Sequence, residues 1–229
     1  MNYVIFIDHK ILFVVADGPV IDTSPSMSKA AAGGEGGRGV LTCQARAPNV
    51  TFKWFREGGE ITPRLAEDSK YQIIDKNLDP LTWQSQLTVN KVQMKDFGPY
   101  GCVAENKYGS HRHSVILVMT SKPETPRGLR VLSTTYNSVM LSWQPGFNGG
   151  FQQYFRIRLR PVGSKDDYQY LTDIPSQATE FEVSNLQVDT QYTFNILAFN
   201  KLGESGFSTG VVQAKTASKY LLRTSAIGS

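Results

Sequence analysis

Short apolar runs, alternating or rich in β-branched residues, recur along residues 20–217 with turn-forming residues between them. No stretch there has the 3.6-residue period of a long amphipathic helix. This pattern is typical of antiparallel sandwiches and predicts an all-β chain. The first series of expected strands comprises residues 40–45, 50–55, 71–74, 85–89, 100–105 and 115–119. The second series comprises residues 128–133, 138–143, 154–160, 168–171, 180–183, 191–200 and 210–215.

A break in composition at residues 121–126 separates the two series. Its two prolines remove backbone donors and restrict φ, so we expect a semi-rigid joint between two domains arranged end to end. The sequence thus predicts two tandem antiparallel β-sandwiches, one over residues 20–121 and one over residues 122–217. Residues 218–229 carry no pattern and are expected to form a disordered C-terminal tail.

Residues 1–19 are either an N-terminal tail or an atypical signal-like segment. Two short apolar runs, 3–7 and 11–16, are split by the polar residues 8–10, whereas a secretory signal has a basic start and one unbroken apolar stretch. The end of the second run, residues 14–16, nevertheless resembles a signal-peptidase cleavage site, and both interpretations stay open.

Composition and charge exclude several classes of function. The net charge of +4 is small, and basic and acidic side chains are nearly balanced in both halves, so no basic stripe suited to nucleic acid exists. Two cysteines are too few for a cysteine-built zinc cage, and their number alone fits one disulfide or two free thiols. No stretch reaches the ~20 apolar residues of a membrane span. We therefore expect any membrane anchor of a longer parent protein to lie beyond Ser229.

Catalytic motifs are not found in the chain. It contains no G-x-S-x-G elbow, no H-E-x-x-H and no phosphate loop. None of its three histidines stands beside a plausible set of nucleophile and carboxylate. We expect no enzyme activity, no cofactor, no metal and no small-molecule substrate.

The first half carries a spaced set of core residues. Cys43 lies in an alternating strand pattern, Trp54 follows eleven residues later, and residues 96–102 fit D-x-G-x-Y-x-C. This set resembles immunoglobulin-superfamily domains of the intermediate or C2 type, and the resemblance covers nearly all of residues 20–120. It implies a Cys43–Cys102 disulfide between two sheets, with Trp54 packed over it.

The same resemblance gives roles to two further residues. Tyr100, two residues before Cys102, matches the tyrosine corner, whose hydroxyl bonds to upstream backbone. Asp96 suits a turn and could pair with a cation near the start of an earlier strand, for which Lys70 is the candidate.

The second half has no cysteine but has its own core signature. Val139, Leu141 and Trp143 alternate, which places Trp143 in a sandwich core. Residues 186–208 resemble the fibronectin type III pattern L-x-x-x-T-x-Y-x-F-x-V-x-A-x-N-x-x-G-x-G-x-S, with Tyr192 as the corner tyrosine. Val188 stands where that family often has proline, a minor departure.

An immunoglobulin domain followed by a fibronectin type III domain resembles adhesion receptors, and residues 143–158 look most like the echinoid and nephrin group. The resemblance implies the extracellular part of a longer single-pass protein of the plasma membrane, which mediates cell–cell adhesion and is coupled to signalling. Its partners would be other immunoglobulin-superfamily proteins, bound homophilically or heterophilically. The alternative is an intracellular titin-like scaffold, because such chains combine the same two modules.

Three candidate sites follow from individual residues. Asn49 begins the only N-x-S/T sequon and is either glycosylated or an unmodified surface asparagine. Phe55 and Val103 lie in the outward phase, because Trp54 and Cys102 set the inward one. They form either an adhesive apolar patch or ordinary isolated surface hydrophobes.

Arg156, Arg158 and Arg160 alternate with core residues and should form a row outside the sheet. The row is either a site for sulfated glycans or an acidic partner, or a solvated face with acidic cross-strand neighbours. His111 and His113 share one strand face, but no third metal ligand accompanies them, so we expect a solvated pair.

Overall fold

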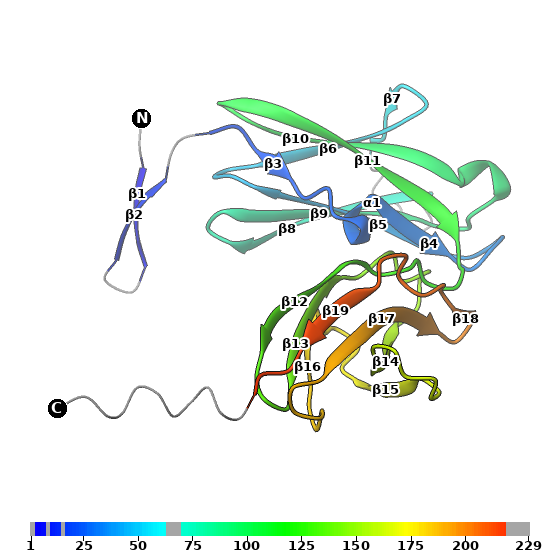
Figure 1. Cartoon of the computed structure of the whole chain (residues 1–229). Coiled ribbons are helices and arrows are strands. Elements are labelled where there is room, and N and C mark those ends of the chain that lie inside the picture. The colour runs from blue at the N-terminus through cyan, green and yellow to red at the C-terminus, as the bar shows by residue number, and fades with distance from the viewer. Residues whose placement is uncertain (1–2, 8–9, 15–16, 63–69, 219–229) are drawn as a thin grey trace. The chain divides into compact units, whose positions relative to one another are not determined.

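The computed structural model describes residues 3–7, 10–14, 17–62 and 70–218 (Figure 1). The chain divides into two compact units, residues 1–120 and 121–229. All but the first residue of the expected tail at 218–229, and the end of the cleavage-like segment, residues 15–16, lie outside the described residues. None of the helices in the described part approaches the length and apolarity of a membrane span.

The first unit is a sandwich of two sheets. One sheet has the order β3-β5-β9-β8 and the other β4-β11-β10-β6-β7, while β1 and β2 pair only with each other. The strands are β1 (Tyr3–Ile7), β2 (Lys10–Val14), β3 (Val20–Ile21), β4 (Lys29–Ala32), β5 (Gly39–Arg46), β6 (Thr51–Arg56), β7 (Gly59–Glu60), β8 (Tyr71–Asp79), β9 (Thr82–Val89), β10 (Gly98–Asn106) and β11 (Gly109–Met119).

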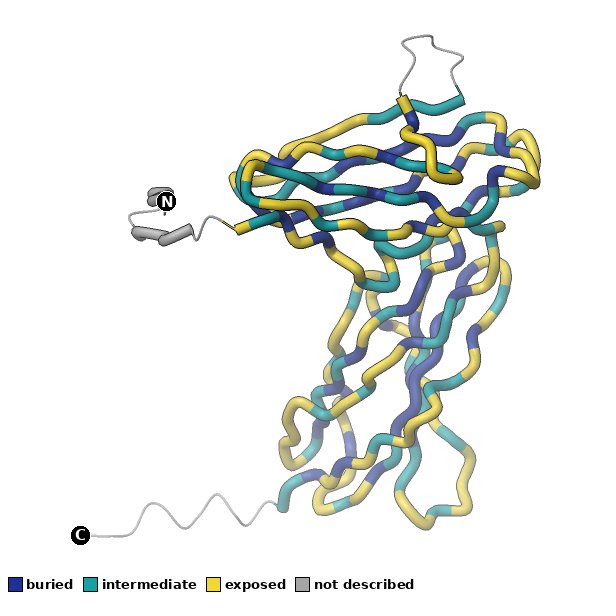
Figure 2. The backbone as a smooth tube through the Cα atoms, turned by 90° about the horizontal axis from the view of Figure 1, so that it is seen from above, coloured by how far each residue is buried: buried dark blue, intermediate teal, exposed yellow. Residues whose placement is uncertain are grey.

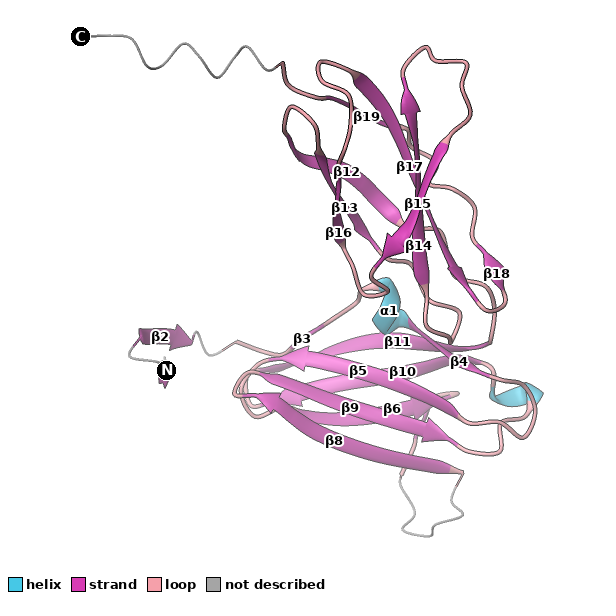
Figure 3. Ribbon diagram, turned by 90° about the horizontal axis from the view of Figure 1, so that it is seen from below, coloured by secondary structure: helices cyan, strands magenta, loops and turns pink. Residues whose placement is uncertain are grey.

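The first strand of this sandwich changes sheets. β3 pairs antiparallel with β5, then the one-turn helix α1 (Pro25–Ser28) intervenes, and β4 pairs parallel with β11 in the opposite sheet (Figure 3). Pro25 suits the start of α1 because the first helical N–H has no partner within a helix. The β3–α1–β4 segment therefore supplies an edge strand to each of the two sheets.

Alternation of side chains builds the core of the first unit. Along β5 every second residue is buried, including Leu41 and Cys43. Buried residues also alternate with more exposed ones along other strands of the chain (Figure 2). Between the sheets, Trp54 and Tyr100 are among the largest fully buried side chains. The two-residue period of apolar side chains in the sequence therefore corresponds to strands that turn one face toward the core.

The second unit is also a sandwich, with no disulfide. Its sheets have the orders β12-β13-β16 and β15-β14-β17-β18, and β19 also pairs with β17. The strands are β12 (Arg127–Thr134), β13 (Val139–Gln144), β14 (Tyr154–Pro161), β15 (Gln169–Ile174), β16 (Glu180–Val183), β17 (Gln191–Asn200), β18 (Gly203–Glu204) and β19 (Val212–Lys215). Both units together give the all-β pair of antiparallel sandwiches that the sequence predicts.

The structure extends several of the expected strands, two of them by five residues or more. β8 runs to Asp79 rather than residue 74, because it pairs with β9 along nearly its whole length. β11 begins at Gly109 rather than residue 115, because its hairpin with β10 closes at the Asn106–Gly109 pair. The short elements β3, β4, β7, β18, α1 and the 3₁₀ turn η1 (Met94–Asp96) were not anticipated.

The entry to the second unit is fixed by a loop. The Ser121 N–H donates to the Gly149 carbonyl at 3.0 Å, and Glu124 N–H donates to the Phe147 carbonyl at 2.8 Å. Gly149 has a φ of +72°, and a Cβ there would lie 1.9 Å from the Ser121 oxygen. Asn200 secures the arrangement by donating to the Ser121 carbonyl at 2.8 Å. Part of the proline-containing link thus belongs to the second unit.

Candidate binding surfaces

The centre of the first unit is the Cys43–Cys102 disulfide. Both cysteines are buried, and Cys102 is directly opposite Trp54 in the β10–β6 register. The Trp54 indole N–H donates to Ser85 Oγ at 2.9 Å, and Ser85 is itself opposite Cys43 on β9. Ser85 satisfies a polar group that burial would otherwise leave unpaired. Sequence reasoning missed it, because a serine within an alternating strand carries no distinguishing signal.

A second buried assembly holds the turn before β10. The Tyr100 hydroxyl donates to the Asp96 carbonyl at 2.9 Å, which is the tyrosine-corner contact. Asp96 forms an ion pair with Lys70 and accepts from the Gln93 N–H at 2.7 Å. Burial acts to raise the pKa of Asp96, but the bonds from Lys70 and Gln93 and the Lys70 charge outweigh it, so the pKa is lowered. The predicted Lys70–Asp96 pair is present.

Arg56 clamps the same turn and was not singled out from the sequence. Its guanidinium lies 4.6 Å from the centre of the Tyr100 ring. It also donates to the carbonyls of Pro99 and Lys95, both at 2.8 Å. A Cβ on Gly98, whose φ is +123°, would come within 3.3 Å of the Arg56 Nη1. The contacts of Arg56 therefore fix the backbone at the start of β10.

The outer face of the β11–β10–β6 sheet carries the predicted apolar pair. Phe55 is opposite Gly101, and Val103 lies between Lys53 and Arg112, so both side chains share the outer face. Both are half-buried. The Arg112 guanidinium lies 5.0 Å from the centre of the Phe55 ring and covers part of it. We call Phe55, Val103 and Arg112 the outer patch.

A charged pair borders the outer patch. Lys53 and Glu105 form an ion pair across β6 and β10, with both side chains partly exposed. The hydrogen bond and the charge of Glu105 raise the pKa of Lys53. The face thus combines an aromatic ring, an arginine and a polar edge, which is the composition typical of protein interfaces.

Asn49 is exposed at the turn before β6. Its φ of +52° lies in the left-handed region, which asparagine tolerates better than most residues. The sequon threonine, Thr51, donates its hydroxyl to the Glu105 carbonyl at 3.2 Å. Asn49 therefore allows the left-handed backbone of this turn, in addition to being the first residue of the sequon.

The expectation of a solvated histidine pair is wrong. His111 and His113 are half-buried on β11 and face the strand that changes sheets. The Ile21 N–H donates to His111 Nδ1 at 3.0 Å, and Ser28 Oγ lies 3.1 Å from His113 Nε2. Burial, then the His111 charge, lowers the pKa of His113, while Asp22 acts in the opposite direction. The pair holds the β3–α1 segment in place.

In the second unit, Trp143 and Tyr192 occupy the core. The Trp143 ring packs edge-on against Phe155 at 5.3 Å between ring centres. Its indole N–H is buried and finds no hydrogen-bond partner in the described part of the chain. The Tyr192 hydroxyl accepts from the Gln187 N–H at 3.0 Å, which closes a second tyrosine corner.

The three arginines of β14 stand on the outer face, opposite the buried Phe155, Ile157 and Leu159. Arg156 forms an ion pair of 2.5 Å with Glu204 and lies 5.2 Å from the centre of the Phe199 ring.

Aromatic rings from two loops hold the other two arginines. The Arg158 guanidinium lies 4.5 Å from the centre of the Tyr168 ring and 4.0 Å from that of Phe207. Arg160 lies 4.4 Å from the centre of the same Tyr168 ring. The row is therefore an ordered arginine–aromatic ladder rather than a freely solvated face.

The buried side chain of Asn195 connects the ladder to the loop that carries Phe207. Its amide donates to the Ser208 and Gly210 carbonyls, both at 3.2 Å, and so ties the Phe207 segment to β17. Its carbonyl oxygen accepts from Arg158 Nε at 3.3 Å. Sequence reasoning found the arginines but missed Asn195, Tyr168 and Phe207, which lie on other strands and loops.

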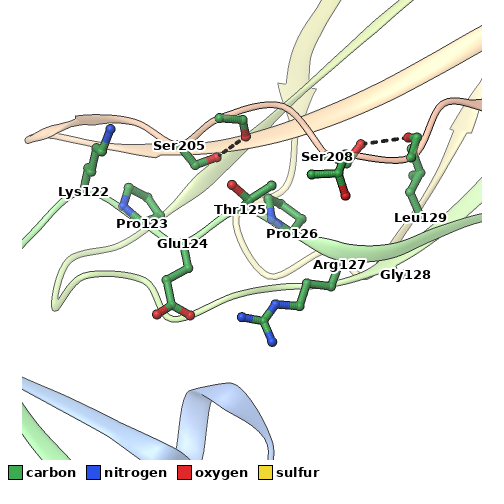
Figure 4. Close-up of a pocket in the computed structure, with 13 residues that line it drawn as sticks. Lys122, Pro123, Glu124, Thr125, Pro126, Arg127, Gly128, Leu129, Ser205 and Ser208 are labelled. Carbon is green, nitrogen blue, oxygen red and sulfur yellow. Dashed lines mark hydrogen bonds between the residues drawn. The ribbon is translucent and has the colours of Figure 1, made fainter.

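A shallow groove of about 740 Å³ lies between the entry segment and the loop before β19 (Figure 4). It is lined by residues 122–129 and by residues in the 205–210 loop, where Ser205 and Ser208 bond to nearby backbone carbonyls. Pro123 and Pro126 lack backbone donors, so this edge is a poor template for an added strand.

No group of three or more potential metal ligands occurs among the described residues.

The fold of each unit agrees with a known domain family. The immunoglobulin domain model matches residues 18–106, and the fibronectin type III domain model matches residues 124–214. The chain is therefore an immunoglobulin domain followed by a fibronectin type III domain.

Similar proteins define the family more closely. Human nephrin is 35% identical over 201 residues, and mouse nephrin is 34% identical over 206 residues. The rat cell adhesion molecule DSCAM is 29% identical over 181 residues. The chain belongs to the immunoglobulin-superfamily cell adhesion molecules and is similar to nephrin, as the sequence resemblance implied.

The matched regions are parts of long proteins. The alignments cover 87% of this chain but 16% of mouse nephrin, and 79% of this chain but 8% of rat DSCAM. Titin domains A168–A170 align with 92% of this chain and 72% of their own, at 22% identity and a TM-score of 0.38.

Proposed function

We propose that this chain is an extracellular part of a cell-surface adhesion receptor, acts by binding other immunoglobulin-superfamily proteins, and is coupled to signalling by a longer parent protein. The relatives at 28–35% identity are adhesion molecules, which supports this function over the titin-like scaffold. The disulfide also supports an oxidising compartment, since cytosolic thiols are kept reduced. Association with the plasma membrane would come from the parent protein.

The adhesive surface we propose is the outer patch of the first unit. Phe55, Val103 and Arg112 place two apolar side chains and an arginine at the centre of an open sheet face. Aromatic residues and arginine are enriched among the side chains that dominate binding energy. The partner is a second copy of this chain or a related receptor.

Bead clustering tests the outer patch. Beads coated with the chain should cluster, and Phe55→Asp should reduce clustering at least about tenfold, because it removes an apolar contact worth about 1–2 kcal/mol or more. Ile74→Asp is the matched control, since it places the same charge at a half-exposed position on β8 of the opposite sheet.

A related receptor on a second set of beads distinguishes heterophilic from homophilic binding. Clustering by Phe55→Asp equal to that of the parent, in both formats, would defeat the outer patch as the adhesive surface. An unchanged tryptophan emission spectrum, to which Trp54, Trp83 and Trp143 all contribute, verifies that each variant is folded.

We also propose that Asn49 carries an N-linked glycan. Its exposure and its place in an intact sequon support this, because the acceptor must be accessible and the chain secreted. A glycan at this turn would make the chain a cell-surface glycoprotein, in agreement with an extracellular location.

A further inference from the structure

The arginine–aromatic ladder of the second unit has charge that its own fold does not neutralise. Arg156 is paired with Glu204, but within the described residues Arg158 and Arg160 have no carboxylate partner. All three arginines are half-buried, so their stems are packed while part of each side chain reaches solvent.

The ladder also holds the guanidinium groups in a form suited to binding. A ring contact forms no conventional hydrogen bond to the five N–H donors of a guanidinium. Tyr168 and Phe207 therefore restrict Arg158, whose side-chain hydrogen bond within the described residues is the one from Nε to Asn195. Binding a ligand would cost less side-chain entropy than it would for free arginines.

The position of β14 limits what form a ligand can take. β14 is paired with β15 on one side and β17 on the other, so it offers no free backbone edge to an added strand. Alternate residues of a strand are about 6.8 Å apart, so the three arginines follow one another at regular backbone intervals along one face of β14. A linear polyanion with repeated charges matches this row.

We propose that the ladder formed by Arg156, Arg158 and Arg160 binds a sulfated polysaccharide chain. The planar fork of arginine fits tetrahedral oxyanions with two parallel N–H···O bonds, which lysine cannot offer. A sulfate group is such an oxyanion and remains charged at physiological pH. This site lies in the second unit and does not depend on the adhesive surface proposed for the first.

Heparin affinity measures the proposed binding. The chain should bind heparin at physiological salt, and Arg156→Gln/Arg158→Gln/Arg160→Gln should weaken binding at least about tenfold. The loss of a single charge-assisted hydrogen bond is enough to lower the affinity by about tenfold. The matched control is Lys122→Gln/Arg127→Gln/Arg130→Gln, which removes three exposed positive charges from other parts of the same unit. It should change the affinity less than about threefold.

Two further measurements keep the outcome decisive. Desulfated heparin should bind at least about tenfold more weakly than heparin, because it keeps its carboxylates but lacks the sulfate groups proposed as the main ligands of the arginines. Arg160→Gln alone serves if the triple variant fails to fold, because the contact that its guanidinium makes within the described part of the chain is with the Tyr168 ring. Equal loss in the ladder and control variants, no loss in Arg160→Gln, or equal binding of desulfated heparin would overturn the proposal. Preference for an acidic protein ligand over heparin would also overturn it.

Discussion

At the residue scale, Asn49 combines two requirements that a single substitution can separate. Its left-handed backbone favours asparagine or glycine, whereas a glycan requires asparagine. We therefore expect Asn49→Gly to abolish the glycan and leave the fold intact. Peptide-N-glycosidase should lower the mass of the secreted parent chain and leave the variant unchanged.

Thr51→Ser is the control for this experiment, because it preserves the sequon and a hydroxyl able to reach the Glu105 carbonyl. It should retain the glycan. An unchanged mass of the parent chain after enzyme treatment would show that Asn49 is a structural asparagine alone.

Other residues show how far sequence reasoning reached at this scale. Cys43, Trp54 and Tyr100 could be identified because they stand at fixed spacings with specific physical tasks. Ser85 and Arg56 could not, since each acts through a contact between residues at least 31 positions apart. A serine or an arginine in a strand gives no sign of such a partner.

At the scale of elements, two histidines hold the segment that changes sheets. His111 Nδ1 accepts from the Ile21 N–H, and His113 lies beside Ser28, with His111 and Asp22 near enough to act on its charge. Burial lowers the pKa of His113 below its ordinary value of 6.5 in the folded chain. The unfolded chain therefore takes up a proton first as the pH falls.

The sign of the pH dependence follows directly. The contribution of His113 is fully present above about pH 6.5 and is lost as the pH falls through its folded pKa. We expect the unfolding free energy of the first unit to decline as the pH falls below about 6.5, and less steeply in His113→Asn. Denaturant titrations at several pH values measure both. Parallel declines in parent and variant would show that other groups cause the effect.

Elements were predictable where side chains alternate over several residues. The long strands β5, β10 and β14 bury one face and could be found from their period of two. The β3–α1–β4 segment could not, because each piece is only two to four residues long and is held by β11, far along the chain.

The arginine ladder illustrates the same limit for a candidate site. The alternation of β14 predicted a row of arginines outside the sheet, and that row exists. The aromatic rings that order it come from separate loops, and a side chain on a third element, Asn195 of β17, ties down the loop of Phe207. Sequence alone therefore left open whether the row was solvated or ordered.

At the scale of the whole molecule, the two units differ in what stabilises them. The disulfide of the first unit joins cysteines 59 positions apart. Closing such a loop contributes about 4 kcal/mol in the chain-entropy model, a large share of the stability of a typical domain. The second unit has no cysteine and relies on packing around Trp143, Phe155 and Tyr192.

Reduction should therefore act on one unit and spare the other. Calorimetry of the oxidised chain and of Cys43→Ala/Cys102→Ala should show the transition of the first unit at a markedly lower temperature in the variant. The transition of the second unit should stay where it is, because its core contains no atom of the disulfide. The Trp143 indole resonance in NMR spectra assigns that transition. A matching fall in the transition temperature of the second unit would mean that the two units unfold as one. An unchanged transition temperature of the first unit would mean that packing around Trp54 stabilises it sufficiently without the disulfide.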